Sequence, residues 1–199
     1  MLCEVKDRFQ IMQQLVIIGG ANGSGKTTLA REFVALEKFT YLGADEIARE
    51  LNPERPEMAA IAAARLFSQR FSELIEKRES LIVESTLSGL SLRKWIGKAE
   101  KFGYNINILF VYLDSPNLCV QRVAARVAKG GHHVPEDDIR RRYARSNANF
   151  WHTYKNLANE WALFNNGEEG IVQVAASTQS GIIVLDEARF KQWQRMVKL

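Results

Sequence analysis

The stretch from Leu15 to Thr28 constrains this chain most, because a short apolar run is followed at once by a glycine-rich loop and a lysine. The apolar run at residues 15–18 predicts a buried strand. The loop fits the spacing Gly-x-x-x-x-Gly-Lys-Thr, in which glycines allow positive φ angles and bring backbone N–H groups close to phosphate oxygens. A helix that begins at Lys26 would direct its positive dipole end at the same phosphates. The pattern predicts a nucleotide-binding loop rather than a glycine-rich hairpin or linker.

The side chains of the loop indicate the two cofactors. Lys26 supplies a positive charge for the β- and γ-phosphates, and the hydroxyl of Thr27 can ligate Mg²⁺. We therefore expect ATP and Mg²⁺. The residues predicted to bind the nucleotide are Gly20, Ala21, Asn22, Gly23, Ser24, Gly25, Lys26, Thr27, Thr28 and, from further along the chain, Arg126.

Length and composition predict one domain of an ordinary globular protein, with 199 residues, 46% of them hydrophobic and 25% charged. No apolar run approaches the roughly 20 residues that cross a bilayer. The first residues mix charges of both signs, unlike a secretory signal. Cys3 and Cys119 form no disulfide framework, so we expect a cytoplasmic protein without a membrane partner. The net charge of +4 suits anionic substrates and does not by itself indicate nucleic acid.

Strand and helix patterns alternate along the chain, which is typical of a parallel sheet covered by helices. We predict an α/β fold, a doubly wound parallel sheet with short C-terminal strands and a helical lid. Residues 1–14 are assigned to an N-terminal extension and residues 15–199 to a single domain, with the lid at about residues 122–146. The predicted strands are residues 15–18, 39–42, 81–83, 106–113, 162–165, 171–175 and 182–185. The predicted helices are residues 26–36, 56–77, 91–102, 116–129, 135–157 and 187–197.

Acidic residues follow the predicted strands, at the carboxyl edge where parallel sheets bind their ligands. Asp45 could accept the proton of an attacking substrate hydroxyl. The alternative is that Asp45 or Glu46 caps the helix that follows. Glu84 is predicted to bind the metal and its water shell, whereas Asp114 has a structural role at a helix start. Thr86 either hydrogen-bonds substrate or satisfies a backbone group at the strand end.

A basic cluster follows the fourth predicted strand. Arg122, Arg126 and Lys129 share one helical face, and four more arginines lie beyond the Gly130-Gly131 break. Two such helices predict a lid that excludes water and places arginines on phosphoryl oxygens. The alternative is a solvated basic face. The arginines beyond the break are Arg140, Arg141, Arg142 and Arg145, of which Arg140 is expected at the surface.

His132 and His133 lie in the loop between the two arginine-bearing helices. Adjacent histidines lack the spacing of a helical zinc pair, and neither a carboxylate nor a cysteine is placed to complete a site. We therefore expect a hydrogen bond from this loop to phosphate or substrate rather than zinc. His132 is the predicted ligand.

With these residues the chain resembles the zeta-toxin-like P-loop kinases, in the small form often labelled predicted ABC-type ATPase. The resemblance covers roughly residues 15–185. It rests on four segments, Gly20–Thr28, Ala44-Asp45-Glu46, Glu84-Ser85-Thr86 and Gly130-Gly131-His132-His133-Val134-Pro135, the last followed by Arg141-Arg142-Tyr143-Ala144-Arg145-Ser146. It implies a P-loop kinase fold and ATP-dependent phosphorylation of a sugar hydroxyl, with UDP-N-acetylglucosamine as the substrate of characterised toxins.

The resemblance also implies site residues. Asp45 matches the catalytic base, Lys26 the phosphate lysine and Arg122 an arginine on the transferred phosphate. The toxins carry a second lid arginine where this chain has His132 and His133, and Arg126 or Arg142 can replace it. We thus predict Asp45, Lys26, Arg122 and Arg126 as catalytic residues. The predicted substrate ligands are Asp45, Glu84, Thr86, His132 and Arg142, and the predicted metal ligands are Thr27 and Glu84.

The function predicted from these residues is ATP-dependent transfer of the γ-phosphate to a hydroxyl of a small anionic substrate, such as a nucleotide sugar. Two alternatives stay open at this stage. One is a regulatory nucleotide switch, and the other is a nucleoside or polynucleotide 5′-hydroxyl kinase. A separate antitoxin protein is a candidate partner.

Overall fold

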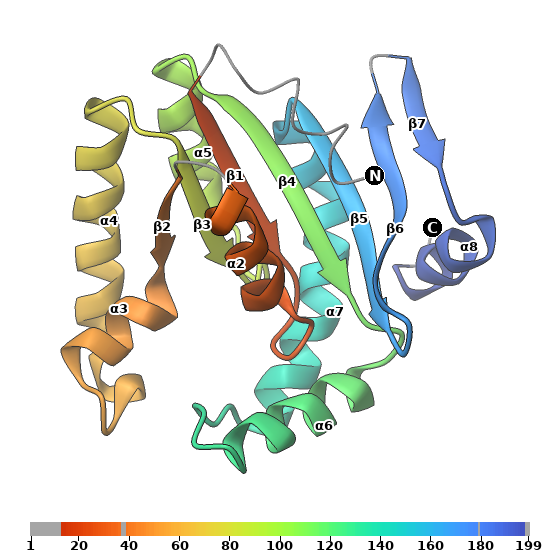
Figure 1. The fold of residues 1–199 in the computed structure, drawn as a ribbon, viewed down its shortest axis with the longest axis horizontal. Coiled ribbons are helices and arrows are strands. Elements are labelled where there is room, and N and C mark those ends of the chain that lie inside the picture. Colours follow the sequence, from red (N-terminus) through yellow and green to blue (C-terminus); the bar gives the residue numbers. More distant parts are fainter. Residues whose placement is uncertain (1–12, 37–38, 179, 198–199) are drawn as a thin grey trace.

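The described strands form one mixed sheet in the order β2-β3-β1-β4-β5-β6-β7 (Figure 1). The structure is a computed structural model, and it describes residues 13–36, 39–178 and 180–197. Strands β1 to β5 pair with one another in parallel, whereas β6 pairs antiparallel with both β5 and β7. The strands are β1 (Gln14–Gly19), β2 (Thr40–Gly43), β3 (Leu81–Ser85), β4 (Asn105–Tyr112), β5 (Glu160–Gly167), β6 (Gly170–Thr178) and β7 (Gly181–Val184).

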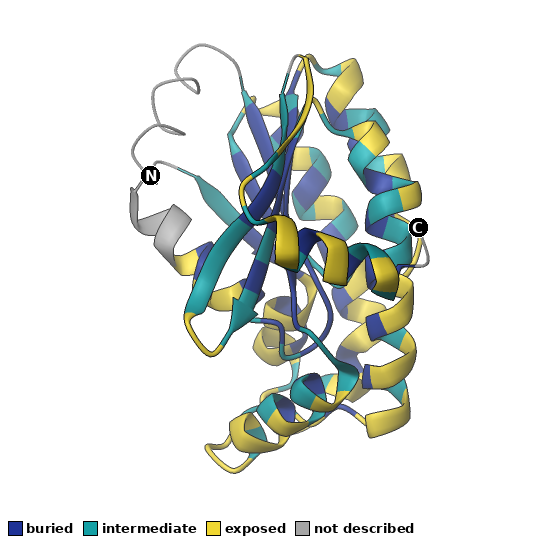
Figure 2. Ribbon diagram, turned by 90° about the vertical axis from the view of Figure 1, so that its right-hand side faces the viewer, coloured by how far each residue is buried: buried dark blue, intermediate teal, exposed yellow. Residues whose placement is uncertain are grey.

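Helices cover both faces of the sheet because alternate residues of each central strand are buried on opposite sides. Leu15 and Ile17 of β1 belong to the core that includes α4, α5, α7 and α8, whereas Val16 and Ile18 pack with α2. Figure 2 shows the buried strands between helices whose outer faces are exposed. The helices are α2 (Lys26–Leu36), α3 (Ala44–Leu51), η1 (Pro56–Ala59), α4 (Ala60–Glu76), α5 (Leu92–Lys101), α6 (Pro116–Val127), α7 (Glu136–His152), η2 (Tyr154–Leu157) and α8 (Glu187–Met196), where η marks a 3₁₀-helix.

Aromatic packing fixes α7 against the sheet. Phe150 of α7 is fully buried and stacks on Phe110 of β4 with 4.4 Å between ring centroids. Trp161 and Trp193 meet Phe150 edge-on at 5.8 and 6.0 Å. Such ring pairs add to the large area that each side chain buries. The N-terminal half of α7, which carries the lid arginines, is therefore attached to a firmly packed base.

The predicted α/β fold with a parallel sheet and additional C-terminal strands is confirmed, although β6 and β7 make the sheet mixed and β6 has 9 residues. The helix predicted at residues 56–77 begins as a 3₁₀-turn at Pro56, and the one predicted at 135–157 ends at His152 before η2. Residues 162–165 were expected as a short tail strand, but β5 has 8 residues and lies parallel beside β4. Asn166 and Gly167 resemble turn residues, yet antiparallel pairing with β6 extends this strand through Gly167.

Three further predictions concern the N-terminal extension, the cysteines and membrane-spanning segments. Most of the predicted N-terminal extension, including Cys3, lies outside the described residues. Cys119 is buried in α6, and burial raises the pKa of its thiol to about 11, so it stays protonated at neutral pH. Among the described helices, none has the length and apolar character needed to cross a membrane.

Candidate active site

The phosphate-binding loop, residues 20–27, connects β1 to α2 at the carboxyl edge of the parallel strands. This edge lies at the bottom of Figure 1, between α3 on one side and α6 on the other. Gly20 and Gly25 have φ angles of 145° and 102°. A Cβ at Gly20 would collide with the carbonyl oxygen of Val111, and one at Gly25 with Nδ2 of Asn166. The loop therefore needs glycine at both positions, for its backbone angles and for space.

Lys26 is buried inside the loop with only 8% of its surface exposed. Its Nζ donates to the carbonyl oxygen of Ala21 at 2.9 Å. Burial lowers the pKa of Lys26, whereas the carboxylates of Glu84 and Asp45 raise it in part. Arg126 is also close enough to lower this pKa. A buried ammonium group is a strong site for an anion.

Glu84, near the end of β3, is held by two hydroxyl groups. Thr27 Oγ1 lies 3.0 Å from both carboxylate oxygens, and the phenol of Tyr41 donates to Oε2 at 2.9 Å. Burial, followed by the Glu84 carboxylate, raises the pKa of Tyr41 far above its ordinary value, so the phenol remains a donor. Two predicted metal ligands, Thr27 and Glu84, are thus brought together. Tyr41 was not predicted.

This oxygen pair fits Mg²⁺. The ion prefers oxygen ligands and is usually bound through one or two protein groups, with water and substrate phosphates completing its octahedron. Thr27 and Glu84 are the residues that would hold it, and it would neutralise charge on the nucleotide phosphates. Among the described residues, no cluster of three histidine, cysteine or acidic side chains offers another metal site.

Tyr41→Phe tests whether the phenol orients Glu84 toward the metal. The variant loses the 2.9 Å hydrogen bond, and we expect the Mg²⁺ concentration for half-maximal ADP binding to rise about 10-fold, the lower end of losses seen for such supporting groups. Calorimetric titrations of ADP at several Mg²⁺ concentrations measure it. The control is Tyr104→Phe, which removes a phenol hydrogen bond to the carbonyl of Glu79. Equal Mg²⁺ dependence in the two variants would contradict the assignment.

Asp45 lies in the first turn of α3, directly after β2. The N-cap of this helix is Gly43, and no side chain caps it, so the alternative in which Asp45 or Glu46 caps the helix is wrong for this structure. Asp45 is exposed, and its carboxylate raises the pKa of Lys26. It is thus free at the edge of the loop and electrostatically coupled to the buried ammonium group.

The three arginines predicted to bind phosphate or substrate have different partners. Arg142 of α7 donates to Oδ1 of Asn22 in the phosphate-binding loop at 3.3 Å. Arg126 donates to the carbonyl oxygen of His132 at 2.7 Å, and this carbonyl is the contact that the structure gives for His132. Arg122 donates to the carbonyl oxygens of Asn166 and Gly167, at the end of β5. Their roles in catalysis or binding stay predictions.

The predicted lid helices are joined by a short loop. At the end of α6, Gly130 has a φ of 82°, its N–H donates to Val127 and that of Gly131 donates to Arg126. This is the Schellman arrangement that ends a helix. Val123, Ile139 and Tyr143 then pack the two helices together. A shallow hollow of about 440 Å³ lies on α6, lined by Arg122, Ala125, Arg126, Lys129, Gly130 and Gly131. Its basic lining suits an anionic group.

Two further predicted positions have structural partners. Thr86 Oγ1 lies 2.9 Å from the Ser88 hydroxyl in the turn after β3. Asp114 accepts a hydrogen bond from Asn165, and Ser115 is the residue that caps α6. Substrate binding by Thr86 stays a prediction, and Asp114 has a structural contact with Asn165 of β5, whereas the helix start is capped by Ser115.

Comparison with known proteins identifies a matching family model, a relative in sequence and solved structures of similar fold. A family model described as AAA domain matches residues 15–149. A protein of Haemophilus influenzae, described as uncharacterized, is 33% identical over 140 residues, which are 70% of this chain and 99% of that relative. The crystal structure of AvrRxo1-ORF1:AvrRxo1-ORF2 with sulphate ions is similar over 98% of this chain and 67% of that chain, with 15% identity and a TM-score of 0.76. A structure of the same complex with ATP has a TM-score of 0.73.

A structure of the PezAT chromosomal toxin-antitoxin system of Streptococcus pneumoniae is similar over 98% of this chain and 84% of that chain, with 14% identity and a TM-score of 0.66. The predicted resemblance to the zeta-toxin-like P-loop kinases is thereby confirmed in the fold. The fold is kinase-like, and its phosphate-binding loop is that of a nucleotide-binding domain. The family model matches more than half of the residues of this chain, and the chain therefore belongs to the AAA domain family.

Proposed function

We propose that this protein is an ATP-dependent kinase that transfers the γ-phosphate to a hydroxyl group of a small anionic substrate. The observation that carries the proposal is the setting of Lys26. Its buried ammonium group is coupled to the carboxylates of Asp45 and Glu84, which come from two different strand ends. A nucleotide switch needs the lysine and the metal ligand, but it has no need of a free carboxylate such as Asp45 beside them.

The chemistry follows from these positions. The acceptor oxygen forms a bond to the γ-phosphorus while the bond from that phosphorus to the β,γ-bridging oxygen breaks, and ADP leaves. The acceptor proton passes to the carboxylate of Asp45. Lys26 and Arg142 stabilise the negative charge on the phosphoryl oxygens. Glu84 and Thr27 would hold Mg²⁺, which neutralises charge on the phosphates when bound.

For the acceptor we propose a nucleotide sugar, with UDP-N-acetylglucosamine as the first candidate. The support is the resemblance to zeta-toxin-like kinases, together with a basic lid that suits a substrate carrying its own phosphates. The structure of the similar AvrRxo1 complex with ATP supports ATP as the donor. Because the PezAT structure is that of a toxin-antitoxin system, we propose a separate antitoxin protein as a partner.

Label transfer tests the proposal. The protein is incubated with γ-labelled ATP, Mg²⁺ and, separately, nucleotide sugars, nucleosides and oligonucleotides, and the products are separated. We expect label in a nucleotide sugar, above the background of a preparation of the Lys26→Met variant. Label in an oligonucleotide or nucleoside would favour the 5′-hydroxyl kinase alternative. Label in inorganic phosphate alone, with every acceptor, would contradict a kinase and favour a nucleotide switch.

A further inference from the structure

The β5–β6 turn, taken together with the adjoining strand ends as residues 165–170, lies against the phosphate-binding loop. We propose that Asn166 in this turn is a positioning residue that holds the loop in its anion-binding conformation. In this role Asn166 affects the binding of phosphate by the loop, which precedes the proposed kinase reaction and does not depend on the acceptor. This role also differs from one in contacting the nucleotide base, which the place of Asn166 near the loop would equally allow.

The contact between the turn and the loop is direct. Nδ2 of Asn166 donates to the carbonyl oxygen of Ser24 at 2.8 Å, although the two residues are 142 positions apart in the chain. A carbonyl oxygen only accepts, so the amide nitrogen of Asn166 must face the loop. The same nitrogen fills the space that a Cβ on Gly25 would need. The Asn166 amide nitrogen therefore lies beside both Ser24 and Gly25 of the loop.

Because the peptide bond is planar, the hydrogen bond from Asn166 to the carbonyl oxygen of Ser24 also affects the direction of the Gly25 N–H. In a trans peptide the carbonyl of Ser24 and the N–H of Gly25 point in opposite directions. A donor that holds this carbonyl toward the turn also directs the Gly25 N–H away from it. The loop binds phosphate through such N–H groups, so the orientation of a single peptide plane affects its affinity. Without Asn166, the Gly25 N–H would lose its fixed direction, because glycine backbone is conformationally free.

The turn is itself anchored on the side of α6 and β4. Arg122 of α6 donates to the carbonyl oxygens of Asn166 and Gly167 at 2.8 and 3.3 Å. Asn165 donates to Oδ1 of Asp114, which follows β4, at 2.9 Å. A charged donor on the backbone of Asn166 makes this anchor stronger than a neutral hydrogen bond.

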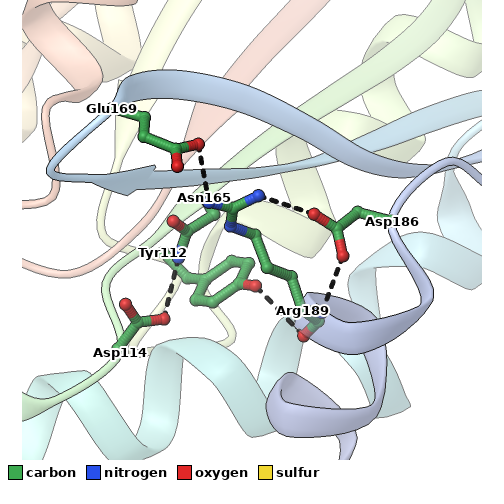
Figure 3. Close-up of polar contacts among 6 residues, drawn as sticks. All are labelled: Tyr112, Asp114, Asn165, Glu169, Asp186 and Arg189. Atoms are coloured by element: carbon green, nitrogen blue, oxygen red, sulfur yellow. Dashed lines mark hydrogen bonds and ion pairs between the residues drawn. The ribbon is translucent and has the colours of Figure 1, made fainter.

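Helix α8 anchors the other end of the turn, as Figure 3 shows. Arg189 donates to Glu169 in the turn at 2.8 Å and to Asp186 at 2.6 Å, so its guanidinium group bridges the two carboxylates. Tyr112 of β4 donates to the backbone carbonyl of Arg189 at 3.3 Å. Because α6, β4 and α8 all hold the turn, Asn166 is a fixed point from which the loop can be positioned.

Inorganic tripolyphosphate distinguishes a role in positioning from a contact with the base, because it carries the phosphates and no base. The variant is Asn166→Leu, which keeps the size and neutrality of the side chain and removes its donor. The control is Asn156→Leu, which removes an amide-to-carbonyl hydrogen bond to His152. Calorimetry with Mg²⁺ gives the Kd of each protein for ATP and for tripolyphosphate, and hydrogen exchange reports on the amides of residues 20–25.

We expect both Kd values to rise by the same factor, about 10-fold, the size expected for one lost hydrogen bond, with faster exchange in the loop and no change in the control. A rise for ATP alone would overturn the proposal in favour of a base contact. Unchanged values for both ligands, or no binding of tripolyphosphate by the wild-type protein, would overturn it as well. Should the leucine variant not fold, Asn166→Ala gives the same comparison. Because no acceptor is used, failure of the kinase proposal leaves this test intact.

Discussion

Replacing Asp45 by asparagine is expected to lower the rate of phosphoryl transfer about 10²- to 10⁴-fold, the usual contribution of a general base, with little change in ATP affinity. Asparagine has nearly the same shape, but its amide oxygen is far too weak a base to take the acceptor proton. The side chain caps no helix and is exposed, so its loss should also leave the free energy of unfolding nearly unchanged. Single-turnover transfer from γ-labelled ATP measures the chemical step, and calorimetry measures ATP binding.

Glu46→Gln is the matched control for this prediction. Glu46 is the next residue in the same helical turn and is also an exposed acid. The carboxylate of Asp45 raises the pKa of Lys26, whereas that of Glu46 raises the pKa of Tyr41. Transfer by the Glu46 variant should therefore stay near the wild-type rate. An Asp45 variant that transfers phosphate at the wild-type rate, or a Glu46 variant that is equally impaired, would remove Asp45 as the base.

Local patterns predicted the parts of the site that depend on neighbours in the chain. The strand, loop and helix around Lys26 follow from one stretch of sequence, because glycine spacing and apolar runs act over a few residues. Asp45 and Glu84 were also predicted, since parallel strands bring their carboxyl ends to one edge. The sequence left open whether Asp45 caps α3, and this depends on the backbone at Gly43.

Contacts between distant segments could not be predicted in the same way. The hydrogen bond from Tyr41 to Glu84 depends on the register in which β2 pairs with β3, and no local pattern specifies this register. Asn166 lies in a segment that resembles an ordinary hairpin turn, and only the parallel pairing of β5 with β4 brings it to the loop. The orientation of Arg122 toward this turn likewise depends on packing at long range.

Lys26→Met is the second variant with a large expected effect. We expect transfer to fall about 10²- to 10³-fold, as when a preorganised charge that stabilises the transition state is removed, and ATP affinity to fall with it. The folded protein without nucleotide should be as stable as the wild type or more stable. Methionine has a similar length and needs no hydration, whereas the wild-type ammonium group is buried and donates a hydrogen bond to the carbonyl oxygen of Ala21. Melting temperatures without ligand measure this.

The pH dependence of ATP binding tests the cause of these effects. Burial lowers the pKa of Lys26 in the folded protein below its ordinary value of 10.5. At pH values between this lowered pKa and 10.5, the folded protein therefore binds fewer protons than the unfolded chain. In that window the wild-type protein without nucleotide should gain stability as pH rises, relative to Lys26→Met. Phosphate favours the charged lysine, so ATP binding should take up a proton there and weaken as pH rises. Calorimetry in two buffers of different ionisation enthalpy detects this uptake. The same uptake by Lys26→Met would show that the proton binds elsewhere, and the buried lysine would then not be the phosphate-binding charge.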